Sequence, residues 1–176
     1  MQVRRALLSC NFPNSFGQSD IPALIPYKSK GEKRNLSYRV DYAEPITSLV
    51  QRLEREHRDV EPKLERVLEL AAEGNIRVAQ SILLAVRTEI LRHAVEEEAV
   101  LVREIMAKAK DRADESVKIF QQHRYVAHFL NQVLPELTTM PAEKASAEME
   151  NFVQEFREHH VREEGVAFPL AIKVSA

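Results

Sequence analysis

Apolar side chains recur every three or four residues over positions 46–72, a period typical of an amphipathic α-helix. The apolar positions are Leu49, Leu53, Val60, Leu64, Val67, Leu68 and Ala71. Pro45 suits the start of a helix, and Gly74 suits the position just after its end. The pattern therefore predicts a helix over residues 46–72.

The same period continues in three further stretches of the chain. It predicts helices from about residue 76 to 109, from about 112 to 138, and from Pro141 onward. Four helices of about 25 to 30 residues joined by short links can bury their apolar faces only by folding back on one another. Residues 45–176 are therefore predicted to form an all-α, up-down-up-down four-helix bundle.

Residues 1–44 lack this period, so we predict an irregular N-terminal arm there. The arm holds five of the eleven aromatic residues and carries a net charge of +3, whereas residues 46–176 carry −5. Its aromatic side chains favour packing on the bundle or on a second copy of the chain, as in a homodimer. Its basic residues are few and scattered, so nucleic-acid binding is not expected.

Composition narrows the class of protein further. Only four of the 176 residues are glycine, which argues against a turn-rich β-sandwich or barrel. Apolar runs fall far short of the ~20 residues that span a bilayer, and the start lacks the roughly 7–15 apolar residues of a signal peptide. The single cysteine, Cys10, cannot form an internal disulfide. We expect a soluble, cytoplasmic protein with no membrane partner.

The second half of the bundle repeats the first at an offset of 66 residues. Residues 57–68 match residues 123–134 at six of twelve positions, and residues 93–100 align with residues 159–166. Each half thus contributes one single histidine and one His-x-x-x-Glu motif. The chain is therefore predicted to be a duplicated helical hairpin.

The repeated histidines and glutamates lie on the apolar faces of the predicted helices. These residues are His57, His93, Glu97, His123, His159 and Glu163. A carboxylate buried among apolar side chains is costly unless it is paired or binds a cation. Imidazole and carboxylate ligands without thiolates suit Fe, Mn or Zn. One such histidine alone is more often a hydrogen-bonded core residue, but recurrence on all four helices favours a dinuclear site in which Glu97 and Glu163 bridge.

The stretch 159–169 fits the pattern His-x-x-x-Glu-Glu-x-x-x-Phe-Pro, and in this it resembles the final helix of the hemerythrin-like, HHE cation-binding family. The resemblance covers about residues 46–172. It implies two non-haem irons and binding of O₂, NO or peroxide, while the imidazole and carboxylate donors themselves would also suit Mn or Zn. It also implies that Glu97 and Glu163 bridge the ions and that the four histidines are terminal ligands: His57, His93, His123 and His159.

One departure from that family changes the functional expectation. Oxygen carriers have a fifth histidine at the position of Ala127, whereas His128 here lies one residue further on, at a flank of the helix. The sequence therefore favours sensing, stress response or iron handling over oxygen transport. A diiron enzyme that reduces NO or peroxide, or that donates iron for iron–sulfur repair, is the alternative, and a metal-free interaction bundle is the third.

Each of three further residues near the motif has two possible roles. His160 and Glu164 repeat the His-x-x-x-Glu spacing one residue later, and we expect them to be solvated or to support the ligands from behind. Glu61 follows His57 by four residues and could add an oxygen ligand, although an exposed or interhelical role is more common. Glu61 is also the single candidate for a proton-delivery group.

Overall fold

The computed structural model describes residues 39–176, and all the secondary structure within that range is helical. The α-helices are α1 (Ile46–Ala72), α2 (Ile76–Glu96), α3 (Arg103–Lys108), α4 (Ala113–His128), α5 (Ala142–Arg162) and α6 (Phe168–Ser175). The π-helical segments are η1 (Glu97–Val102), η3 (Phe129–Val133) and η5 (Glu163–Ala167). The 3₁₀ segments are η2 (Lys110–Arg112) and η4 (Leu134–Thr139).

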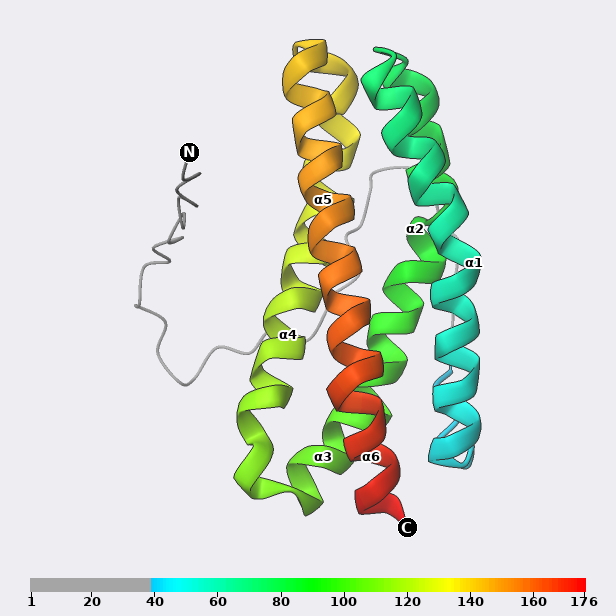
Figure 1. Cartoon of the computed structure of the whole chain (residues 1–176), viewed down its shortest axis with the longest axis vertical. Coiled ribbons are helices and arrows are strands. Elements are labelled where there is room, and N and C mark those ends of the chain that lie inside the picture. The colour runs from blue at the N-terminus through cyan, green and yellow to red at the C-terminus, as the bar shows by residue number, and fades with distance from the viewer. Residues whose placement is uncertain (1–38) are drawn as a thin grey trace, which may run out of the picture. The chain divides into compact units, whose positions relative to one another are not determined.

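These elements join into four long helical runs that lie side by side as a bundle (Figure 1). The first run is α1, and the others are α2 to α3, α4 to η4 and α5 to α6. The runs agree with the four predicted helices, which confirms an all-α bundle. The predicted arm falls on residues 1–44, most of which lie outside the described residues.

The turn between α1 and α2 explains why the first helix ends where the sequence predicts. Gly74 has a φ of +77°, a conformation that glycine adopts without a steric penalty. The N–H of Asn75 then donates to the carbonyl of Leu70 over 2.8 Å, which satisfies a backbone group at the helix end. This turn lets α1 and α2 pack along each other.

The core consists of two apolar clusters separated by a polar layer. On α1, Leu53 belongs to one cluster and Leu64 to the other, and both are completely buried. Burial of such a side chain contributes about 1.5–3 kcal/mol relative to exposure. His57 lies between them on α1, and the other buried histidines occupy the same level on their own helices. The clusters therefore hold a layer of polar side chains away from bulk water.

No helix in the described part of the chain is long and apolar enough to cross a lipid bilayer.

Candidate metal centre

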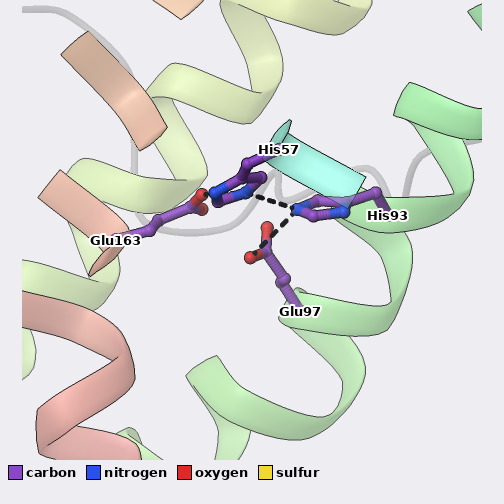
Figure 2. Close-up of side chains that lie close together, drawn as sticks. All are labelled: His57, His93, Glu97 and Glu163. Carbon is purple, nitrogen blue, oxygen red and sulfur yellow. Dashed lines mark hydrogen bonds and ion pairs between the residues drawn. The ribbon is translucent and has the colours of Figure 1, made fainter. Parts of the chain in front are cut away.

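All six side chains predicted as ligands come together in the polar layer. His57, His93, His123 and His159 come from α1, α2, α4 and α5, and Glu97 and Glu163 are the first residues of η1 and η5. All six are buried, the most exposed being His93 at 7%. Figure 2 shows His57, His93, Glu97 and Glu163 turned toward one another.

The six side chains form two overlapping groups of four. The first position is formed by His57, His93, Glu97 and Glu163, and the second position by Glu97, His123, His159 and Glu163. Within each group, one potential ligand atom per residue lies within 4.8 Å of all the others. Because both glutamates belong to both groups, the arrangement could hold two neighbouring metal ions bridged by two carboxylates.

The ring nitrogen Nε2 of each histidine faces the inside of this centre. The distances from Nε2 to a carboxylate oxygen are 3.4 Å from His57 to Glu163, 3.3 Å from His93 to Glu97, 3.1 Å from His123 to Glu97 and 3.0 Å from His159 to Glu163. The Nε2 atoms of His57 and His93 lie 3.1 Å apart. Four nitrogen donors thus converge on the shared carboxylates.

The other ring nitrogen, Nδ1, faces an oxygen acceptor on the outer side of the centre in all four histidines. The pairs are His57 with Glu164 (2.9 Å), His93 with Glu56 (2.8 Å), His123 with Glu98 (2.9 Å) and His159 with Gln122 (3.4 Å). When Nδ1–H donates to such an oxygen, the lone pair of Nε2 is free to bind a metal. The outer acceptors therefore favour the tautomer that a metal ligand needs.

Several inner oxygen atoms lack the hydrogen bonds that burial normally requires. Within the described residues, neither carboxylate oxygen of Glu163 accepts a hydrogen bond, and Oε1 of Glu97 accepts none either. Buried polar atoms in proteins are nearly always satisfied, and an isolated buried carboxylate is strongly disfavoured. A cation between the histidines would satisfy these oxygens, so the donor set fits a metal.

The charges in the metal-free centre are balanced by protons. Burial opposes a charge on His93, but the Glu97 and Glu56 carboxylates raise its pKa to about 10. Burial also opposes a charge on His123, and its carboxylate partners raise its pKa well above the ordinary value. Burial disfavours the charged form of Glu97, yet these two histidines hold its pKa well below the ordinary value. A metal ion that binds here must therefore displace protons.

His159 behaves differently from His93 and His123. Burial lowers the pKa of His159 to about 4, and the positive charge of His123 adds to this effect. His159 is therefore neutral at physiological pH, ready to offer Nε2 to a metal without losing a proton first.

The outer acceptors follow the same repeat as the candidate ligands. Of the four, only Glu164 was expected from the sequence to support a ligand, and only as one of two alternatives. Glu56 and Gln122 each precede a repeated histidine, and Glu98 and Glu164 each follow a bridging glutamate. The outer acceptors could have been recognised as polar residues that recur at the offset of 66. The pattern of apolar residues along each helix does not indicate them, because they lie one position away from the apolar face.

The π-helical segments η1 and η5 also begin at equivalent positions, Glu97 and Glu163. A π-helical turn widens the helix locally and changes the direction of the side chains around it. Such turns are frequent at functional sites. Here the change from α-helix to π-helix occurs at the two shared carboxylates. The periodicity of the apolar residues did not predict this change.

Two arginines hold Glu56 in place behind His93. The Glu56 carboxylate lies 2.8 Å from Arg92 and 3.2 Å from Arg52. Its burial opposes ionisation, but the bonds from His93 and Arg92 lower its pKa to about 2. His93 therefore faces an ionised acceptor, whereas its counterpart His159 faces the neutral amide of Gln122.

The remaining candidates lie outside the two groups. His128 is exposed, as expected of a residue at the flank of its helix. Glu61 pairs with Arg157 and belongs to neither group, so nothing supports the extra oxygen ligand.

His160 was expected either to be exposed to solvent or to support the ligands from behind, and the expectation of an exposed side chain is wrong. Its ring is 8% exposed and stacks on His57, with 3.7 Å between ring centroids. The charged neighbours Arg157 and Glu164 suggested a surface position, but contact with another helix covers the ring. Glu164 accepts the Nδ1–H of His57, so both residues support a ligand from behind.

Comparisons of this chain with protein-family models, with curated proteins and with solved structures find no match.

Proposed function

We propose that this chain is a hemerythrin-like protein that holds two non-haem iron ions and binds or senses O₂, NO or peroxide. The observation that carries the proposal is the pair of buried groups that share Glu97 and Glu163. An up-down-up-down topology is part of the proposal. The course of the chain in Figure 1 supports it, because the colour runs along the bundle and back in successive helices.

The donor set favours iron over zinc. Each position offers two imidazole nitrogens and two carboxylate oxygens, with no thiolate. Four protein ligands complete the tetrahedral shell of a structural zinc, whereas iron and manganese commonly take six ligands and keep places for an exogenous molecule. When bound, iron would supply an open coordination place and one-electron redox chemistry.

The chain's own residues would prepare the centre for that role. The outer acceptors orient the four imidazoles so that Nε2 of each would face the metal, which displaces the protons held on His93 and His123 when it binds. The apolar clusters on both sides of the polar layer limit its contact with water. Such surroundings protect a bound small molecule from uncontrolled proton transfer.

Binding or sensing fits the surroundings better than the alternative of a diiron enzyme that reduces NO or peroxide or donates iron for repair. Reduction needs protons delivered to the bound molecule. Glu61, the one proton donor suggested by the sequence, instead pairs with Arg157. Turnover of NO or peroxide in the presence of a reductant would favour the enzyme over the sensor.

Metal analysis of protein purified without oxygen tests the proposal. We expect about two iron atoms per chain, because four histidines and two shared carboxylates serve two ions. A Mössbauer spectrum of two magnetically coupled ferric ions after oxidation would identify them as one centre. His128→Ala is the matched control and should keep both ions. One zinc per chain, without coupled iron after iron loading, would contradict the proposal.

A further inference from the structure

A fifth buried histidine, His160, lies beside the candidate metal centre but belongs to neither group of ligands. It is 8% exposed, yet no hydrogen bond or ion pair joins its ring nitrogens to any of the described residues. Buried polar atoms in proteins nearly always have a partner. At the offset of 66, the residue that corresponds to His160 is Ala94. Neither the ligand set nor the repeat therefore explains a histidine at this position.

The ring contacts of His160 leave its two nitrogens available. Its ring stacks on that of His57, with 3.7 Å between the centroids and 12° between the planes, and the ring of Phe156 lies 4.3 Å away. Stacking uses the face of a ring, whereas both nitrogens of an imidazole lie at its edge. A buried imidazole without an ion-pair partner is neutral, and one of its nitrogens then carries a lone pair. His160 can therefore bind a metal ion while it stays stacked on His57.

A cavity of about 440 Å³ brings His160 together with two candidate ligands of the first position, His57 and His93, which line it as well. Asp59 and Glu89 also line the cavity, and both are exposed. The cavity therefore connects the surface of the bundle with the buried histidines. A liquid water molecule occupies about 30 Å³, so an ion fits in this space together with several waters.

The charges at the rim of the cavity favour cations over anions. The exposed residues of its lining are Asp59, Lys63 and Glu89, two carboxylates and one ammonium group. The Lys63 ammonium lies 3.9 Å from the Glu89 carboxylate, whereas Asp59 has no ion pair within the described residues. A negative rim raises the local concentration of cations. The rim thus attracts the class of ion that an imidazole inside the cavity can bind.

We propose that His160 is an entry ligand, which binds a divalent metal ion inside the cavity and passes it to His57 and His93. The ring of His57 is stacked on that of His160, and the centroid of the His93 ring lies 6.5 Å from it, so the transfer is short. One imidazole replaces another around the ion, so the ion keeps its oxidation state and His160 is available for the next ion. The inference rests on the proposed function, in that the centre holds metal, and adds how the metal reaches the buried carboxylates.

Uptake of Co²⁺ by the metal-free chain tests this inference, because bound Co²⁺ absorbs visible light and can be followed by stopped-flow mixing. His160→Phe keeps a ring against His57 but removes both nitrogens. Its rate of uptake should fall by roughly tenfold or more, because the ion loses an intermediate ligand. The number of Co²⁺ ions bound at equilibrium should stay that of the wild type. The matched control is His128→Phe, at an exposed histidine outside the cavity lining, which should take up Co²⁺ at the wild-type rate.

A second variant detects the ion at position 160 directly. In Cys10→Ser, His160→Cys, a thiolate takes the place of the imidazole, and thiolates are strong ligands of divalent transition metals. A thiolate-to-cobalt absorption band in the near ultraviolet should appear early during uptake and fall as the visible bands develop. Cys10→Ser alone is the control and should show no such band. Absence of the band in the double variant would contradict the inference.

The outcomes separate this inference from the proposed function. Equal rates of uptake in His160→Phe and His128→Phe contradict the inference. A loss of bound Co²⁺ at equilibrium in His160→Phe also contradicts it, because His160 would then be a permanent ligand. Two coupled irons in the wild type leave the proposed function intact in both cases. A chain that binds neither Co²⁺ nor Fe²⁺ contradicts both, whereas slow uptake in His160→Phe by a chain that holds one zinc supports this inference alone.

Discussion

The two candidate metal positions have equivalent histidines but differ in what lies behind them. Behind the first position, an ionised Glu56 held by Arg92 accepts the Nδ1–H of His93, and His160 stacks on His57. At the offset of 66, Gln122 corresponds to Glu56 and Ala94 corresponds to His160. A repeat can therefore keep equivalent candidate ligands while the outer contacts give the two positions different properties.

The outer contacts differ in strength as well as in chemical type. The Glu56 carboxylate lies 2.8 Å from His93, whereas the Gln122 amide oxygen lies 3.4 Å from His159. A charged acceptor forms the stronger hydrogen bond and raises the basicity of the imidazole behind it. We therefore expect the first position to hold its ion more tightly than the second.

The largest loss of metal is expected from substitution of a carboxylate that both positions share. Glu163→Ala should remove both ions, because this carboxylate belongs to both groups. His159→Ala should release mainly the ion of the second position. Metal content per chain, measured after dialysis, distinguishes the two outcomes. Loss of a single ion in Glu163→Ala would show that the carboxylate serves one position.

The same variants have a consequence for stability. A ligand that binds only the folded state adds RT ln(1 + [L]/Kd) to the free energy of unfolding. The metal-loaded wild type should therefore lose more thermal stability on addition of a chelator than Glu163→Ala does. An equal loss in both proteins would mean that metal binding does not depend on Glu163.

A smaller change, in metal affinity, is expected when the outer acceptors of the two positions are exchanged. Glu56→Gln makes the first position resemble the second and should weaken its metal affinity by roughly 10–100-fold, the usual cost of losing such a partner. Gln122→Glu should strengthen the second position. Competition with a metal-binding dye measures both affinities.

Glu44→Gln is the control for this exchange, because Glu44 pairs with Arg52 but does not contact His93. It should leave both affinities unchanged. Equal affinities of the two positions in the wild type would contradict the assigned difference.

The sequence predicted those features that depend on periodicity along one helix. Four helical runs follow from the apolar stripes, and candidate ligands such as His93 and Glu97 follow because they share a stripe and recur at the same offset. Both kinds of signal depend on spacing alone, so they can be recognised without knowing which helices are neighbours.

The features that were missed depend on contacts between helices. Glu56 lies 100° around the helix from His57, on a side that looks solvent-exposed until His93 of α2 is placed against it. The burial of His160 likewise depends on the ring of His57 from α1.

The smallest expected effect is a change of stability with pH in the metal-free protein. It compares His93 of the first position with His159 of the second. The raised pKa of His93, about 10, contributes stability that is complete below its ordinary value and is lost as pH rises toward 10. The lowered pKa of His159, about 4, acts in the opposite direction and reduces stability as pH falls toward 4. Urea unfolding of the metal-free chain should therefore show a maximum of stability near pH 6.5, the ordinary pKa of histidine.

Because Glu56 helps to raise the pKa of His93, Glu56→Gln should complete its alkaline loss of stability at a lower pH, whereas Glu44→Gln should follow the wild type. An unchanged alkaline profile in Glu56→Gln would show that the carboxylate behind the first position does not set the charge of His93.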